Sequence, residues 1–212
     1  MMYFFGRIKE ISEIINALEK RKHIVITGNY GIGKTGLAKH LSDITKQKCQ
    51  FVFADFSKTP STVCNEILRK VSPKTPPEHR RKYMKYKTAR SLIAELTLKD
   101  NRQPVIVLDN ISELTHQKLA FIHRIVFSKK LLIIAITEGF LPERDLFQLR
   151  ACLMPSHLIK LGNLGTKDAV DFLRHASRKN SLNWSETHIR MLAEVTGGYP
   201  LGMKEFVKRE IK

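Results

Sequence analysis

Cysteine is scarce in this chain, and paired metal-ligand motifs are missing from it. The three cysteines, Cys49, Cys64 and Cys152, are widely spaced and include no CxxC pair. Neither a disulfide framework nor a zinc site is therefore indicated. His116 and His123 could share a helix face, but no third ligand accompanies them. We interpret both as ordinary helix residues.

The chain also lacks the long apolar segments that direct proteins to membranes. Its first residues, MMYFFGRIKE, contain too short an apolar run for a signal peptide, and no stretch approaches the length of a membrane span. We therefore expect no membrane partner. We expect a reducing, intracellular setting, either cytoplasmic or associated with DNA.

Acidic residues are few relative to basic ones. The 212 residues include 37 Lys and Arg against 20 Asp and Glu, which gives a formal net charge of +17. Such an excess favours an anionic partner, such as a nucleic acid. The alternative is a basic surface that only interacts with solvent.

The most informative motif is GNYGIGKT, at residues 28–35. It lies between an apolar run (23–27) and a helical stretch (37–47), which is the strand–loop–helix order of a phosphate-binding loop. Glycines let backbone N–H groups face a phosphate chain, and the helix N-terminus adds a positive dipole. A glycine-rich turn that binds nothing is the alternative. We expect these residues to bind ATP: Gly28, Asn29, Tyr30, Gly31, Ile32, Gly33, Lys34, Thr35 and Gly36, with Lys34 on the β- and γ-phosphates and Thr35 on Mg²⁺.

Apolar runs alternate with helical periods along the chain. We predict strands at 23–27, 49–56, 104–109, 131–137 and 157–161, helices between them, and an irregular proline-containing segment at 72–87 before a helix at 88–100. This alternation predicts a three-layer α/β/α core with a parallel sheet over residues 1–162. Three helical segments without a strand follow, so we expect a small all-helical lid over 163–212.

Acidic and polar residues follow two of the predicted strands. Asp109 ends the buried strand PVIVLD, where we expect it to hold Mg²⁺ together with Thr35; the alternative is a strand-capping aspartate. The next residue is Asn110, at a position where many ATPases have a glutamate. An amide can orient the attacking water but cannot take its proton. Hydrolysis is then slow, absent, or supported by another acid such as Glu113.

Two further residues are candidates for the catalytic step. Thr137 ends the strand 131–137, where a hydroxyl can sense the γ-phosphate or satisfy backbone groups. Arg150, on the following helix, is a candidate arginine finger that would reach a nucleotide on a neighbouring subunit. A solvated or salt-bridged arginine is the alternative, and Arg144 lies nearby.

Basic residues concentrate between Lys70 and Arg90, with one acid among them, Glu78. Lysines and arginines there would neutralise DNA phosphates and make binding steeply salt-dependent, without base-specific reading. A solvated loop is the alternative. The candidate DNA-binding residues are Lys74, Arg80, Arg81, Lys82, Lys85 and Lys87, interleaved with Tyr83 and Tyr86.

Two flanking motifs carry a family resemblance. FFGRIKEISEI (4–14) resembles the F-x-G-R-x-x-E-h box of the AAA+ and STAND ATPases, particularly the archaeal-type and origin-recognition initiator branch. TGGYPLGMKEF (196–206) is similar to the G-x-P-L signature of their lid. LDN, AIT and Arg150 follow the family's order for Walker B, sensor 1 and the arginine finger. The resemblance implies that Gly6 and Arg7 lie near the adenine pocket, that Tyr199 and Pro200 close over the base or ribose, and that Lys204 stands where the lid usually has arginine.

The length of the chain suggests a narrower resemblance. The chain ends at Lys212, just after the expected lid, and cores of this size resemble the transposition-regulator ATPases. The resemblance implies a homo-oligomer that assembles on duplex DNA through its ATP sites and regulates a partner enzyme in transposition, replication or repair. The alternative is a STAND-type nucleotide switch in signalling or defence with slow or no hydrolysis, which Asn110 and the lid motif fit. A small-molecule kinase fits neither flanking motif.

Overall fold

Five parallel strands form the centre of the structure, a computed structural model that describes residues 4–71, 85–95 and 101–211. They are β1 (His23–Gly28), β2 (Cys49–Asp55), β3 (Gln103–Ile111), β4 (Leu132–Thr137) and β5 (Ser156–Leu161), in the order β2-β3-β4-β1-β5. Every neighbouring pair in this order is parallel. The predicted fold class, a three-layer α/β/α core with a parallel sheet followed by helices, is confirmed.

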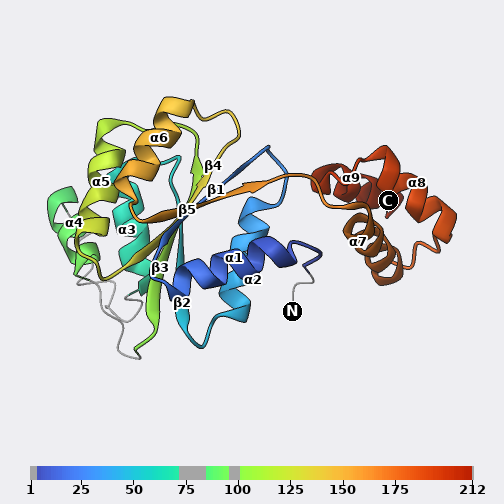
Figure 1. The fold of residues 1–212 in the computed structure, drawn as a ribbon, viewed down its shortest axis with the longest axis horizontal. Coiled ribbons are helices and arrows are strands. Elements are labelled where there is room, and N and C mark those ends of the chain that lie inside the picture. Colours follow the sequence, from blue (N-terminus) through green and yellow to red (C-terminus); the bar gives the residue numbers. More distant parts are fainter. Residues whose placement is uncertain (1–3, 72–84, 96–100, 212) are drawn as a thin grey trace.

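Helices cover both faces of the sheet (Figure 1). α1 (Ile8–Glu19) and α2 (Lys34–Ile44) pack on one face, and α3 (Pro60–Val71), α4 (Tyr86–Ala94), α5 (His116–Phe127) and α6 (Glu143–Cys152) pack on the other. Within β4, Ile133 and Ala135 face α3–α6, whereas Ile134 and Ile136 face α1 and α2. This alternation continues to the end of the strand and decides to which face its last side chains point.

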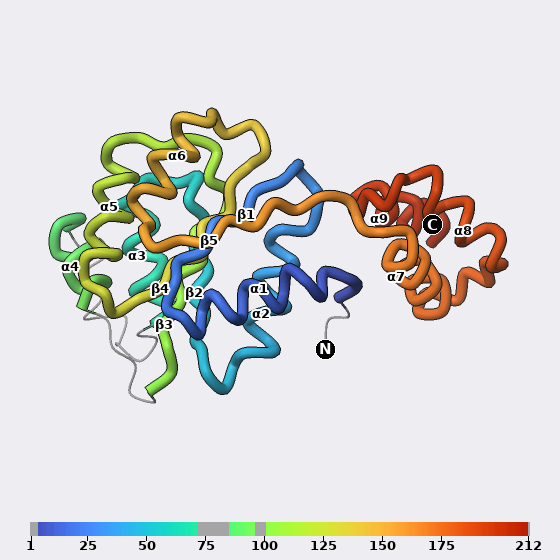
Figure 2. The backbone as a smooth tube through the Cα atoms, in the orientation of Figure 1, coloured from blue at the N-terminus to red at the C-terminus, as the bar shows by residue number. Residues whose placement is uncertain are grey.

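Three helices follow the sheet and pack around an apolar core of their own. They are α7 (Thr166–Lys179), α8 (Glu186–Val195) and α9 (Pro200–Glu210), and Leu173, Leu192 and Met203 are buried between them. Figure 2 shows that the chain leaves β5 and leads into these helices at one end of the molecule. The division of the chain at residue 162 stays a prediction.

The predicted boundary before the helix at 88–100 is wrong. Residues 86 and 87 were assigned to the irregular segment 72–87, but Tyr86 and Lys87 form the first turn of α4. Tyr86 packs against the core on the α3–α6 face, a tertiary contact that favours an earlier helix start than the sequence pattern does. The remainder, 72–84, and the predicted helical residues 96–100 lie outside the described residues. Within the described ranges, no helix has the length and apolar character needed to cross a membrane.

His23 opens β1 at the edge of the sheet opposite the phosphate loop and is 6% exposed. Its Nδ1 accepts a hydrogen bond of 3.0 Å from the backbone N–H of Ile133. Burial, together with the nearby charge of Arg21, lowers the pKa of His23 to about 4. Only the neutral imidazole has the free lone pair that this hydrogen bond needs.

We expect the free energy of unfolding to fall as the pH drops from about 6.5 to about 4, because the unfolded chain then binds a proton that folded His23 does not. The pKa shift corresponds to roughly 3 kcal/mol at most. His23→Asn keeps an acceptor at this position but does not titrate, so its stability should depend less on pH. Urea unfolding of both proteins across this pH range measures their free energies of unfolding. If these free energies fall equally steeply with pH in both proteins, the pH dependence belongs to other groups.

Candidate nucleotide-binding site

The phosphate loop connects β1 to α2 and depends on glycine. Gly31 and Gly33 have φ angles of +72° and +99°, in the region that glycine adopts most readily. At Gly28, a Cβ atom would lie 2.6 Å from the carbonyl oxygen of Leu161. The sequence predicted this loop, and the structure places it at the carboxyl edge of the sheet, where open α/β sheets bind ligands.

Lys34 opens α2 and is only 5% exposed. Its ammonium donates to the carbonyl oxygens of Gly28 (2.8 Å) and Asn29 (3.0 Å) and to the carboxylate of Glu138 (3.1 Å). All three ammonium protons therefore have acceptors. Our reading of the sequence missed Glu138; a carboxylate directly after a buried strand was the signal that could have identified it.

Thr35 and Asp109 meet although 74 positions separate them along the chain. The Thr35 hydroxyl donates to Asp109 Oδ2 at 2.8 Å, and Asp109 Oδ1 accepts from the Asn110 N–H at 2.9 Å. A hydroxyl and a carboxylate are hard oxygen donors of the kind Mg²⁺ prefers. The two residues thus fit the metal-holding pair predicted from the sequence.

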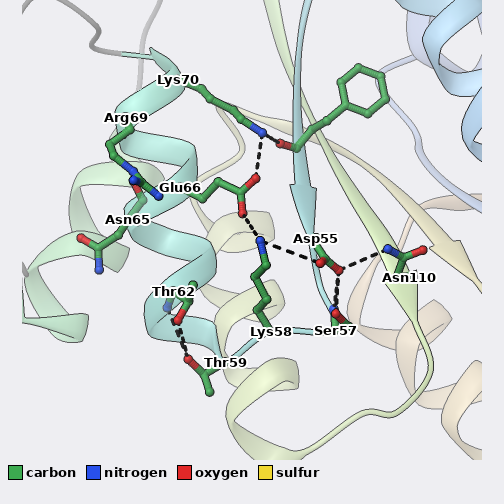
Figure 3. A network of polar contacts seen from close by, with 11 residues as sticks. Asp55, Ser57, Lys58, Thr59, Thr62, Asn65, Glu66, Arg69, Lys70 and Asn110 are labelled. Atoms are coloured by element: carbon green, nitrogen blue, oxygen red, sulfur yellow. Dashed lines mark hydrogen bonds and ion pairs between the residues drawn. The ribbon is translucent and has the colours of Figure 1, made fainter.

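Asn110 lies in a β-bulge. The pairing of β3 with β4 shifts between Leu108 and Ile111, and Asn110 has a φ angle of +60°. Its side-chain amide donates to Asp55 Oδ1 at 3.2 Å (Figure 3). Asn110 therefore contacts the end of β2, and the bulge explains how the residue after Asp109 comes to face a neighbouring strand.

Asp55 belongs to a polar network that joins β2 to α3 (Figure 3). The Ser57 N–H and hydroxyl donate to its Oδ1 at 3.1 and 2.7 Å, and Lys58 lies 3.8 Å from its other oxygen. Hydrogen bonding from Ser57, more than that from Asn110, holds the pKa of Asp55 below its usual value. Glu66 links Lys58 to Lys70, whose ammonium also donates to the Phe53 carbonyl.

Thr137 and Arg150 lie in very different surroundings. The Thr137 side chain is fully buried and its Oγ1 has no hydrogen-bond partner within the described residues. By strand alternation it follows Ile133 and Ala135 toward α3–α6, and its hydroxyl forms no hydrogen bond to Lys34 or Asp109. Arg150 is exposed on α6 and forms no ion pair with another described residue. Both assigned roles stay predictions.

The N-terminal box joins the phosphate loop to the segment after β5. Arg7 is 7% exposed; its guanidinium donates to the carbonyl oxygens of Ile32 (3.3 Å) and Gly162 and pairs with Glu10 (3.2 Å). Gly6 has a φ angle of +66°, and a Cβ there would collide with the Asp168 carboxylate. The predicted adenine-pocket residues thus lie where the core meets α7.

The C-terminal helices contact the phosphate loop directly. The Tyr199 hydroxyl donates to the carbonyl oxygen of Tyr30 at 2.7 Å, and the buried Pro200 begins α9. Lys204 is exposed on the same helix. Tyr199 therefore lies beside the phosphate loop, and the closure of Tyr199 and Pro200 over the base or ribose stays a prediction.

The candidate DNA-binding residues are only partly described. Lys85 and Lys87 are exposed at the start of α4. The other four lie outside the described residues: Lys74, Arg80, Arg81 and Lys82.

Comparisons with known proteins agree with this arrangement. A protein-family model described as AAA domain matches residues 17–143. No curated protein sequence matches the chain. Among solved structures, Cdc6p from Pyrobaculum aerophilum has a TM-score of 0.73 at 16% identity, over 97% of this chain and 61% of that one.

Two further structures share the fold at low identity. The Aeropyrum pernix Orc1 protein, solved in complex with DNA, has a TM-score of 0.65 at 15% identity, over 98% of this chain and 60% of that one. The Thermotoga maritima RuvB Holliday junction branch migration motor has a TM-score of 0.60 at 15% identity, over 97% of this chain and 62% of that one. The chain thus spans about three fifths of the length of these proteins.

Lys34→Ala should bind ATP roughly 10- to 100-fold more weakly, because a charged hydrogen bond of this kind contributes about 1.5–3 kcal/mol. Anisotropy of a fluorescent ATP analogue measures the affinity, and circular dichroism checks that the variant is folded. The matched control is Lys39→Ala, an exposed lysine on the same helix, which should bind as the wild type does. Unchanged affinity in Lys34→Ala would contradict the assigned site.

Proposed function

Because the chain belongs to the AAA domain family, we propose that it is an ATP-binding ATPase whose nucleotide state controls its assembly on duplex DNA. The observation that carries this proposal is the contact of Thr35 with Asp109 beside the buried ammonium of Lys34. A phosphate loop, a cation and a metal-holding oxygen pair occur together at one edge of the sheet. These are the groups that hold a nucleoside triphosphate and its metal ion in phosphate-loop ATPases.

Each part of the site has a distinct task. Backbone N–H groups of residues 28–36 face the phosphates, and Lys34 neutralises the β- and γ-phosphates. Thr35 and Asp109 hold Mg²⁺, which supplies further neutralisation of phosphate charge when bound. Tyr199 and Pro200 close over the base or ribose, with α7–α9 acting as a lid that begins after residue 162.

The DNA part of the proposal rests on charge and on likeness of fold. A net charge of +17 attracts a polyanion, and Lys85 and Lys87 present two exposed cations at the start of α4. Structures with the same fold include an Orc1 protein in complex with DNA and a Holliday junction branch migration motor. Binding through phosphates predicts little preference for DNA sequence. The bound protein then regulates a DNA transaction within the cell.

Arg150 extends the proposal to a homo-oligomer. Its exposed side chain has no ion-pair partner among the described residues, so it is free to enter a neighbour's nucleotide site. A site divided between two subunits couples nucleotide state to assembly, because only the triphosphate form bridges them.

The second candidate function is a nucleotide switch of the STAND type. The hydrogen bond from Tyr199 to Tyr30 favours it, since a lid that touches the phosphate loop can report which nucleotide is bound. Such a switch needs no DNA, so DNA binding separates the two functions.

Fluorescence anisotropy of a labelled duplex, titrated with protein in an ATP analogue, in ADP or without nucleotide, tests the proposal. We expect binding in the ATP analogue to be tighter by about tenfold or more, and to weaken steeply with salt. Equal affinity in all three states would favour the nucleotide switch.

Arg150→Ala and its matched control, Arg144→Ala, complete this experiment. Both residues are exposed on α6 and their removal changes the net charge equally. Arg150→Ala should lose the ATP-dependent part of DNA binding and keep nucleotide binding, whereas Arg144→Ala should behave as the wild type does. Equal loss in both would assign the effect to charge alone.

A further inference from the structure

Asn110 leaves open which group takes the proton of the attacking water. Its amide cannot accept that proton, and its side chain donates a hydrogen bond to Asp55. In the proposed ATP site, on which this assignment rests, another carboxylate must take that proton.

Three other carboxylates, on or shortly after β2 and β3, are poorly suited to accept this proton. Asp109 accepts a hydrogen bond from the Thr35 hydroxyl and belongs to the predicted metal-holding pair. Asp55 accepts from Ser57 and Asn110, and its pKa is lowered chiefly by the Ser57 hydrogen bond. The Glu113 side chain is 65% exposed and pairs with Lys118.

Glu138 directly follows β4, the strand between β1, which carries the phosphate loop, and β3, which carries Asp109. Alternation along β4 places it on the same face as Ile134 and Ile136, toward α2. Its side chain is 15% exposed and lies 3.1 Å from the Lys34 ammonium. Among the carboxylates of the described residues, it alone forms an ion pair with Lys34, the proposed ligand of the γ-phosphate.

The backbone of Glu138 is held on both sides. Its N–H donates to the carbonyl oxygen of Ile111 at 3.1 Å, and its own carbonyl accepts from the N–H of Leu141 at 3.1 Å. Ile111 directly follows the bulge at Asn110. The β-bulge that directs Asn110 toward Asp55 is thus followed by the residue whose carbonyl accepts the hydrogen bond from the Glu138 backbone.

We propose that Glu138 is the catalytic base of ATP hydrolysis, replacing the glutamate that is absent at position 110. In the structure its carboxylate pairs with the Lys34 ammonium at 3.1 Å. Triphosphate oxygens then take its place on the ammonium, because they bring more negative charge to the same donors. The carboxylate is released beside the γ-phosphate, where it accepts a hydrogen bond from the attacking water.

The chemical step then balances. The water oxygen forms a bond to the γ-phosphorus while the bond from that phosphorus to the β,γ-bridging oxygen breaks. The electron pair of the broken bond leaves with ADP, the water proton moves to a Glu138 carboxylate oxygen, and orthophosphate is the second product.

Glu138→Gln separates this role from a structural one. The amide keeps the size of the side chain but neither holds Lys34 as an ion pair nor takes a proton. We expect ATP-analogue affinity equal to or tighter than that of the wild type, and single-turnover hydrolysis slower by roughly 10²- to 10⁴-fold. The matched control is Glu143→Gln, an exposed glutamate at the start of α6, which should keep the wild-type rate.

The pH dependence gives a second readout. The wild-type rate should fall at acid pH as the base becomes protonated, and Glu138→Gln should lack this acid limb. If Glu138→Gln does not fold, Glu138→Asp, which keeps a carboxylate, should retain the limb at a reduced rate. Its absence there would overturn the proposal.

The outcomes distinguish this inference from the proposed function. A wild-type chain that binds no ATP analogue would overturn both. ATP-analogue binding with no wild-type hydrolysis, or with equal rates in the wild type and Glu138→Gln, would overturn the role of Glu138 alone.

Discussion

The Lys34 ammonium lies almost out of contact with water, and a buried charge of this kind is costly unless it is paired and hydrogen-bonded. Two carbonyl oxygens of the phosphate loop and the Glu138 carboxylate provide that compensation. Removing one partner of such a pair is destabilising because it leaves a buried charge uncompensated, whereas another anion in the same place keeps the ammonium paired. The same three contacts therefore hold the ammonium within the loop, and phosphate oxygens can replace the carboxylate among them.

Groups from distant parts of the chain share this edge of the sheet. The Arg7 guanidinium joins the phosphate loop to Gly162, and Tyr199 contacts the loop from the C-terminal helices. A change in the loop on nucleotide binding would thus reach the helices through two hydrogen-bonded contacts. This coupling is what both candidate functions require, an assembly controlled by ATP or a lid that reports nucleotide state.

The strands and the phosphate loop were predictable because each leaves a local pattern, a continuous apolar run or fixed glycine spacing. The partners of Lys34 and Asn110 were not. Glu138 lies 104 positions from Lys34, and the bulge that turns Asn110 to Asp55 depends on the pairing of β3 with β4. Similarly, the early start of α4 reflects the packing of Tyr86 on the core, which periodicity does not record.

A structure of the chain with Mg²⁺ and a non-hydrolysable ATP analogue tests the central claim most directly, that the loop holds a triphosphate by exchanging Glu138 for phosphate on Lys34. It should show the γ-phosphate hydrogen-bonded to the Lys34 ammonium. The Glu138 carboxylate should no longer contact that ammonium and should instead lie beside a water next to the γ-phosphate. Nucleotide bound elsewhere, or bound in the loop while Glu138 still holds Lys34, would contradict the account.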